Sequence, residues 1–459
     1  GHVRIYRNNN GTWTQVGADI DGEAAYDYSG QSIDLSSDGS SIAIGALGNN
    51  GNGYDSGHVR IYRNNNGTWT QVGADIDGEA AGDFSGASVS LSDDGNIVAI
   101  GANKNDGNGD RSGHVRIYRN NNGTWTQVGA DIDGEAAGDD SGYSVSLSGD
   151  GETVAIGANF NDGNGNNSGH ARIYKNNNGT WTQIGTDIDG ESAGDQSGLS
   201  ISLSNEGGIV AIGSPYNQAN GSFSGQVRVY QNDNGTWTQV GADIHGNYAD
   251  YFGLSVSLTN NGRTVAAGAP YNYGNSARIY GIDLESPLIT GPSGNAGAGS
   301  SAKSINENST AVHTFSANES ITWSLNGGAD AGKFNINSSS GALSFANAPD
   351  YENPSDSDSN NSYVVGVRAT DTAGNTSDQT VTVNINALDE GEASFAISGT
   401  ATVGQTITVT ETSADPDGKG FWHSYQWQTS TDGNTWSQVE TNKPDSSSDY
   451  TISKADEGK

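Results

Sequence analysis

Short runs of alternating hydrophobic and polar residues fill the first 281 positions of the chain, and they return at a fixed interval. The stretch "GHVRIY" begins at Gly1, Gly57 and Gly113, which gives a period of 56 residues. One repeat holds β-rich runs at 56–63 and 68–76, and "GASVSLSDDGNIVAIGAN" (86–103) holds two more. Alternation of this kind is typical of half-buried strands, so the pattern predicts four antiparallel strands per repeat and no helix.

Two-residue turns separate the runs within each repeat. The Asn-Gly step of "NNNG" indicates a type I′ hairpin, because that turn needs a positive φ at both central residues. "NGT" also fits a glycosylation sequon, but we interpret it as the hairpin turn. A second turn, Asp94-Gly95, is predicted to join the other pair of strands. It recurs as Asp38-Gly39, Asp150-Gly151, Glu206-Gly207 and Asn261-Gly262.

A single four-stranded sheet cannot cover both of its faces, so the repeats must pack against one another. Four antiparallel strands per repeat describe the blade of a β-propeller. One tryptophan per repeat is interpreted as a packing residue between blades; these are Trp13, Trp69, Trp125, Trp181 and Trp237. The repeated histidines stand at isolated strand positions and are interpreted as packed or half-exposed residues rather than metal ligands; these are His2, His58, His114 and His170.

Two further elements of the repeat resemble a known family. "FSGASVSL" (84–91) and "IGAN" (100–103), followed by a "G-x-V-R-I-Y" strand, resemble the FG-GAP repeat of integrin α-subunit propellers and their bacterial relatives. The resemblance implies a β-propeller of at least five blades over residues 1–284. The last repeat supplies only three strands, so the N-terminal "TWTQVG" strand could close the ring. The family's D-x-D-x-D-G-x-x-D calcium loop is replaced here by the two-residue turns, so its metal sites are not expected.

The remaining connections of each repeat are predicted to meet on one face of the propeller, and they are acidic. In "NDGNGDRSG" the residues Asp106, Asn108 and Asp110 stand at alternate positions, as at the start of an EF-hand calcium loop. The glycine at loop position six and the closing glutamate of that motif are missing, so a solvated turn is the alternative. Because these loops vary while the turns repeat, we expect binding on the loop-bearing face.

A Pro/Gly/Ser-rich stretch at 285–302 predicts a domain boundary. Residues 285–389 resemble a bacterial cadherin-like β-sandwich, on "INEN" (305–308), "PDYENP" (349–354) and "VVGVRATDTAGN" (364–375). The family's paired "DAD" motif is missing. The resemblance implies a calcium site, for which solvated loop acids are the alternative; its ligands would be Glu307, Asp350, Glu352, Asp389 and Glu390.

Residues 390–459 are interpreted as a truncated Ig-like β-sandwich with Trp427 as its core anchor. Strands are predicted at "SFAISG", "TITVTET", "SYQWQTS" and "TWSQV". The chain has no methionine and opens inside a repeat, so we expect a fragment of a longer protein. The whole is predicted to be all-β, a propeller followed by two sandwiches.

Charge and motifs narrow the function. The chain carries 54 acidic and 20 basic residues, which argues against nucleic acid and anionic membranes as partners. It has no cysteine, no run of 18 apolar residues and no catalytic motif, so membrane insertion and an enzymatic role are not expected. The favoured hypothesis is an extracellular or cell-surface bacterial adhesin whose propeller binds a protein or glycan ligand on a stalk of sandwiches. The alternatives are a purely structural envelope protein and a lectin-like propeller.

Overall fold

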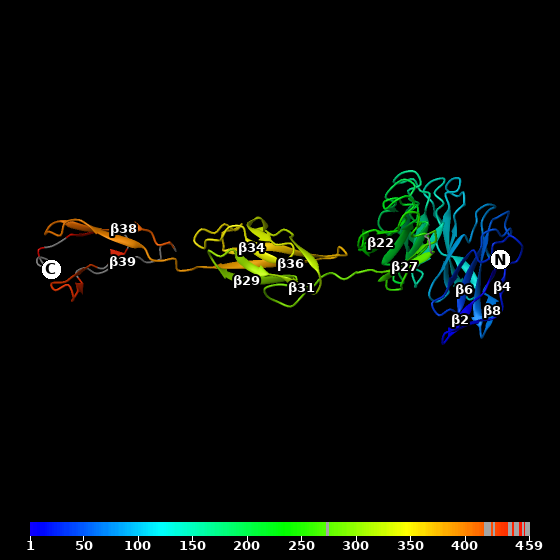
Figure 1. Cartoon of the computed structure of the whole chain (residues 1–459), viewed down its shortest axis with the longest axis horizontal. Coiled ribbons are helices and arrows are strands. Elements are labelled where there is room, and N and C mark those ends of the chain that lie inside the picture. The colour runs from blue at the N-terminus through cyan, green and yellow to red at the C-terminus, as the bar shows by residue number, and fades with distance from the viewer. Residues whose placement is uncertain are drawn as a thin grey trace. The chain divides into compact units, whose positions relative to one another are not determined.

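The computed structural model describes residues 1–271, 275–416, 424–425, 427–438, 443–444, 449–451 and 454. The chain forms two compact units, Gly1–Glu285 and Ser286–Lys459 (Figure 1). Apart from one short 3-10 helix, η1 (Ala331–Lys333), the regular structure in this described part consists of strands, so the all-β prediction is confirmed. No helix among the described residues is long and apolar enough to cross a membrane.

The repeats of the first unit fold into nearly identical antiparallel sheets. The first complete sheet has the order β5 (Ser32–Leu35), β6 (Ser41–Ala46), β7 (His58–Asn65), β8 (Thr68–Gln71), and a short β9 (Ile76–Asp77) pairs with β7. Three more sheets repeat this order. The second consists of β10 (Ser88–Leu91), β11 (Ile97–Ala102), β12 (His114–Asn121), β13 (Thr124–Gln127) and β14 (Ile132–Asp133), and the third of β15 (Ser144–Leu147), β16 (Thr153–Ala158), β17 (His170–Asn177), β18 (Thr180–Gln183) and β19 (Ile188–Asp189). The fourth consists of β20 (Ser200–Leu203), β21 (Ile209–Ser214), β22 (Gln226–Asp233), β23 (Thr236–Gln239) and β24 (Ile244–His245). These sheets are the blades of the β-propeller.

The sequence predicted one continuous strand over residues 68–76, and this was wrong. The structure has two short strands there, β8 and β9, and the other complete blades show the same break. In the first complete blade the chain leaves β7 after Gln71 and returns at Ile76. Gly73 takes a φ of +80° in the break, and the indole of Trp125 from the next repeat lies against it. The break makes room for that ring, which the pattern of a single repeat cannot reveal.

Consecutive blades pack face to face. The first strands β5, β10, β15 and β20 follow one another, each beside the next. Val89 and Leu91 of β10 are buried in a cluster with Ala43, Val59 and Ile61 of the preceding blade. The indole Nε1 of Trp125 donates a hydrogen bond of 2.8 Å to the carbonyl of Val72. Trp69, Trp181 and Trp237 make the same bond to Val16, Val128 and Ile184. The packing role predicted for these four tryptophans is confirmed.

The two kinds of turn differ in backbone conformation. Asn66 and Gly67 have φ values of 52° and 92°, both positive as the predicted type I′ turn requires. In the Asp94-Gly95 turn only the glycine, at 68°, has a positive φ. The second turn is therefore not a copy of the first.

Partial sheets stand at the two ends of the propeller. β25 (Val256–Leu258), β26 (Thr264–Ala269) and β27 (Ser276–Gly281) form a three-stranded sheet. At the N-terminus β1 (His2–Val3) pairs with β4 (Ile20–Asp21), and β2 (Tyr6–Asn9) pairs with β3 (Thr12–Gln15).

Among the described strands β3 pairs only with β2, and β27 only with β26, so the N-terminal strand does not close the ring. The described part of the first unit therefore holds four complete blades and a partial sheet at each end. Trp13 in the N-terminal hairpin is 65% exposed, and Ile33 and Ile279 are 52% and 74% exposed. The faces at both ends of the propeller are therefore open.

The second unit begins with a β-sandwich. One sheet has the order β29 (Ser300–Asn306), β36 (Thr376–Asn386), β35 (Ser362–Asp371), β32 (Ile321–Leu325), with β29 parallel to β36. The other has the order β30 (Ala311–Thr314), β34 (Ala342–Phe345), β33 (Phe334–Ile336), and β28 (Ile289–Thr290) pairs with β31 (Ser316–Ala317). Alternate residues of β35, such as Val365 and Val367, are buried against Trp323, Phe334 and Phe345.

The last segment forms small sheets. β37 (Ser394–Ser398) and β43 (Asp449–Thr451) flank β38 (Thr406–Ser413), while β39 (Ser424–Tyr425) pairs with β42 (Lys443–Pro444) and β40 (Gln428–Thr429) with β41 (Ser437–Gln438). The half-buried ring of Trp427 stacks on that of Tyr450, with centroids 5.6 Å apart. None of the described residues of this segment is buried, and parts of two predicted strands (Gln426 and Val439) lie outside the described residues. The Ig-like fold stays a prediction.

Candidate functional site

The loops predicted to bind calcium are held by hydrogen bonds at the junctions between blades. The Nδ2 of Asn108 donates to the carbonyls of Gly134 and Glu135 at 2.8 and 3.1 Å. Asn52, Asn164 and Asn220 hold the other junctions in the same way. Asp106 accepts the backbone N–H of Arg111 at 2.7 Å. Two of the three proposed ligands are thus engaged in fixing the loop, which favours the alternative of a structural turn.

Three positions at the corner of each junction carry residues that differ from repeat to repeat. Two of them, Arg111 and Asp140 at one junction, have positive φ values of 53° and 55°, and the N–H of Asp140 donates to the carbonyl of Arg111 at 3.1 Å. The third, Lys104, donates through its backbone N–H to the carbonyl of Asp83. We call these three residues a corner triplet. The four triplets are Gly48, Asp55, Phe84; Lys104, Arg111, Asp140; Phe160, Asn167, Gln196; and Tyr216, Phe223, Tyr251.

The side chains of the triplets differ in chemistry although the backbone holds them alike. In the second triplet Asp140 forms ion pairs with Lys104 and, at 3.2 Å, with Arg111. In the fourth, Phe223 and Tyr251 stack with ring centroids 5.2 Å apart, and Tyr216 meets Tyr251 edge-on at 5.5 Å. Tyr271, which is 68% exposed, extends this aromatic cluster. The face therefore presents charges at one junction and aromatic rings at another.

A hollow of about 400 Å³ lies between the second and third triplets. It is lined by Asp110, Arg111, Ala137, Gly138, Phe160 and Asn167. Asp110, the third residue predicted as a calcium ligand, therefore faces this hollow together with an arginine. The loop-bearing face combines a recess with variable side chains at its rim.

The acids predicted as a calcium site in the second unit lie together in part. One carboxylate oxygen from each of Glu307, Asp350 and Glu352 falls within 4.8 Å of the others. Glu307 is 2% exposed. Its Oε2 accepts the N–H of Tyr351 at 2.7 Å and its Oε1 that of Leu388 at 2.6 Å. This glutamate thus joins the "PDYEN" loop to the segment that follows β36.

The other two predicted ligands do not belong to this cluster among the described residues. Asp389 accepts the N–H of Gly391 at 3.1 Å, and Glu390 accepts the side-chain amide of Asn308. Local hydrogen bonds hold both side chains, so the structure brings three of the five predicted ligands together.

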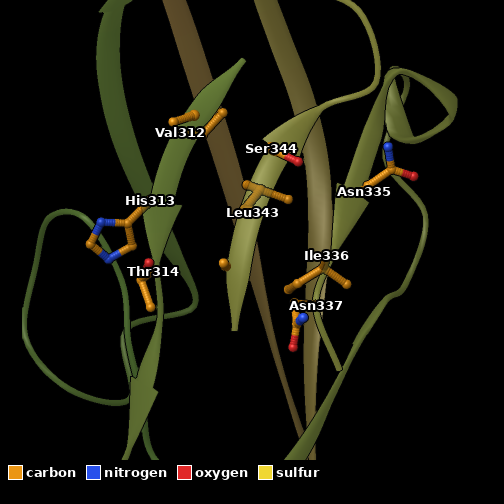
Figure 2. A pocket seen from close by; sticks show the side chains of 10 residues that line it. Val312, His313, Thr314, Asn335, Ile336, Asn337, Leu343 and Ser344 are labelled. Atoms are coloured by element: carbon orange, nitrogen blue, oxygen red, sulfur yellow. The ribbon is translucent and has the colours of Figure 1, made fainter. Parts of the chain in front are cut away.

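A second hollow, of about 540 Å³, lies over the sheet of β30, β34 and β33 (Figure 2). Its side chains include His313, Asn335, Asn337 and Leu343. The His313 ring meets Phe315 edge-on at 5.0 Å, and burial lowers the pKa of this histidine. The lining is aliphatic, amide, hydroxyl and imidazole in character, and nothing in the sequence pattern predicted it.

Comparison with protein families finds one match. The FG-GAP repeat family matches residues 130–174. The repeat resembles FG-GAP, as its residues predicted. This match covers β14, β15, β16 and the first part of β17, so it supports an FG-GAP propeller without describing the whole chain. No curated protein matches the chain.

Solved structures with similar folds are distant. A putative 6-phosphogluconolactonase from Bacteroides uniformis is 14% identical, with a TM-score of 0.43, 83% of this chain covered and 92% of that one. The β-propeller domain of the trilobed protease from Pyrococcus furiosus is 9% identical, with a TM-score of 0.33 and coverages of 76% and 93%. The third cadherin domain of human protocadherin 7 is 21% identical, with a TM-score of 0.18, 23% of this chain covered and 90% of that one. Likenesses this weak carry no argument about function.

Proposed function

We propose that the chain is part of an extracellular bacterial adhesin, in which the loop-bearing face of the propeller binds a protein or glycan on a cell surface or matrix. One observation carries the proposal: repeats that are otherwise nearly identical differ in their corner triplets. Non-glycine residues with a positive φ are strained by about 1 kcal/mol, yet two recur at each of the four junctions. A backbone kept constant under different side chains is the arrangement expected of a surface that presents a binding face.

The fourth triplet is the strongest candidate for the contact itself. Its aromatic cluster includes Phe223, which is 38% exposed, and the more exposed Tyr271. Exposed aromatic rings are frequent in the energetic centres of protein interfaces, and their faces also stack on sugar rings. The net charge of −34 argues against polyanionic ligands.

The test exchanges this triplet for its neighbour. The double variant Phe223→Asn, Tyr251→Gln copies Asn167 and Gln196, which hold the same backbone conformation. The full chain and the variant are applied to a glycan array and to a panel of purified matrix proteins. For any probe that the wild type binds, we expect at least a tenfold loss of affinity in the variant.

The matched control lies on the opposite, turn-bearing face. Thr124→Ala and Thr180→Ala change exposed residues beside the Asn-Gly turns, and binding should stay within twofold of wild type. Equal loss in both variants, or a wild-type chain that binds no probe, would favour the purely structural alternative.

The sandwich of the second unit is proposed as a calcium-stiffened stalk. Calcium prefers six to eight oxygens, several of them from carboxylates, and Glu307, Asp350 and Glu352 supply the nucleus of such a set. In calorimetry of the full chain we expect one calcium ion at this cluster. When free calcium is 100 times Kd, it should stabilise the sandwich by about 2.7 kcal/mol.

The test uses Asp350→Asn with Glu352→Gln. Glu307 is left in place because its hydrogen bonds to the backbone hold the fold. The heat of calcium binding at this cluster should disappear in the double variant. Undiminished heat, or a wild type that takes up no calcium at millimolar concentration, would show that these residues are solvated loop acids.

A further inference from the structure

Each repeated histidine at the start of a long strand lies between two carboxylates from different repeats. At the second junction His114, the first residue of β12, has its Nδ1 3.9 Å from Glu79 Oε2 and 3.7 Å from Asp131 Oδ2. Glu79 belongs to the connection before the junction, and Asp131 to the break between β13 and β14. The same triad occurs as Glu23, His58, Asp75 and as Glu135, His170, Asp187, with distances of 3.6 to 3.9 Å.

Neighbouring residues orient both carboxylates. The Nε2 of Gln127 donates to Oδ1 of Asp131 at 2.6 Å, so Oδ2 is the atom that faces the imidazole. Arg116 lies 3.5 Å from Oε1 of Glu79, which leaves Oε2 toward the imidazole. The arginine is itself fixed by a 2.7 Å hydrogen bond to the carbonyl of Asp77. Each acid thus uses one oxygen for structure and presents the other.

One nitrogen of each imidazole, Nε2, has no hydrogen-bond partner among the described residues. The side chains of His58, His114 and His170 are only 1 to 2% exposed, and their buried Nε2 atoms make no hydrogen bond within the described part of the chain. Burial lowers the pKa of all three histidines, that of His170 to about 4. Around His114 the other facing charges are Asp83 and Arg116. Glu79, Asp131 and Asp83 outnumber the arginine, so the site is negative.

At the fourth junction a glutamine replaces the histidine and makes a direct hydrogen bond to the glutamate. Gln226 stands there, and its Nε2 donates directly to Glu191 Oε2 at 2.9 Å. The imidazoles stop 3.6 to 3.9 Å from their acids, beyond hydrogen-bond distance. Zinc binds nitrogen and oxygen at about 2.0 to 2.2 Å, so two of its tetrahedral ligands lie about 3.4 Å apart. The distances from Nδ1 to the carboxylate oxygens in the triads are therefore close to the distance between two ligand atoms of one zinc ion.

We propose that the three histidine junctions each bind a divalent transition-metal ion of the zinc type, through His Nδ1, Asp Oδ2 and Glu Oε2. One imidazole and two carboxylates suit zinc, whereas calcium needs a larger set of oxygens. The carboxylates are only partly covered, with exposures of 28% for Asp75 and 47% for Glu23, and this gives the ion a path from solvent. Because each triad joins two successive repeats, the three ions connect four consecutive repeats.

The experiment is a calorimetric titration of the full chain with zinc chloride at pH 7. Its matched variant is His58→Gln, His114→Gln, His170→Gln, which copies the natural fourth junction. We expect the variant to bind three fewer zinc ions than the wild type and each single substitution to remove one. Zinc should also raise the melting temperature of the propeller in the wild type more than in the variant.

Two results would overturn the proposal. One is a wild type that takes up no zinc at millimolar concentration, and the other is unchanged stoichiometry in the triple variant. If the triple variant fails to fold, the set Asp75→Asn, Asp131→Asn, Asp187→Asn gives the same comparison. Replacement of zinc by cobalt supplies an independent readout, because visible absorption of nitrogen-ligated cobalt must weaken stepwise as histidines are removed.

Discussion

The two faces of the propeller follow opposite rules. On the turn-bearing face the hairpin is the same in every complete blade: Asn64 accepts the N–H of Gly67, and Asn120, Asn176 and Asn232 make the equivalent bond. On the loop-bearing face the backbone is equally constant, but the corner triplets change. Side chains that the fold requires are repeated, and side chains that the fold does not require vary. This difference is the basis for the proposal that the repeated positions serve structure and the varying ones serve binding.

The largest effect should come from the glycines inside the blades. Gly101 lies in β11, where an added Cβ would overlap the carbonyl oxygen of Gly142 and the hydroxyl of Ser88. We expect Gly101→Ala to reduce the free energy of unfolding by about 3 kcal/mol, measured by denaturant titration. Gly281→Ala in β27 is the control, because a Cβ there meets nothing within 4 Å, and it should cost under about 0.5 kcal/mol. Similar losses in both would mean that blade packing is not what the repeated glycine serves.

The tryptophans offer a second pair of variants, one at a half-buried ring and one at an exposed ring. Trp125→Ala removes a half-buried ring and its hydrogen bond to Val72, and should cost about 2 to 4 kcal/mol. Trp13→Ala changes an exposed copy of the same residue and should cost under about 0.5 kcal/mol. Thermal melting of both variants checks the difference. A large loss with Trp13→Ala would show that the N-terminal hairpin is packed against another surface in solution.

The smallest effect should appear on the loop-bearing face. Gln196 has a φ of 50°, so Gln196→Gly should remove strain and leave stability unchanged or raised by up to about 1 kcal/mol. The measurement is again denaturant unfolding. A clear loss of stability would mean that the corner side chains hold the fold, and the comparison of the two faces would then fail.

What the sequence predicted correctly depends on single repeats or adjacent ones. Strand positions follow from alternation, the Asn66-Gly67 turn from its need for positive φ, and tryptophan packing from its period. The acids Glu307, Asp350 and Glu352 were grouped through the cadherin-like resemblance, and the structure brings these three together.

The errors concern contacts that no single repeat encodes. The break after Gln71 depends on an indole from the following repeat. Closure of the propeller ring depends on whether β27 pairs with the N-terminal hairpin. His114 was interpreted as a packed or half-exposed residue at an isolated position; it is buried, but the alternation of one strand cannot show that Glu79 and Asp131 from two connections converge on it. The sequence does hold one signal for this site: three repeats carry His58, His114 and His170 where the next carries Gln226.

The most direct test of the central claim is hydrogen–deuterium exchange of the full chain with and without a glycan or matrix protein that it binds. The proposed function predicts slower exchange in the corner segments 103–112, 138–143, 214–224 and 248–253, and no change at the turns 120–124 and 176–180. Protection confined to those turns, or to the second unit, would contradict binding by the loop-bearing face.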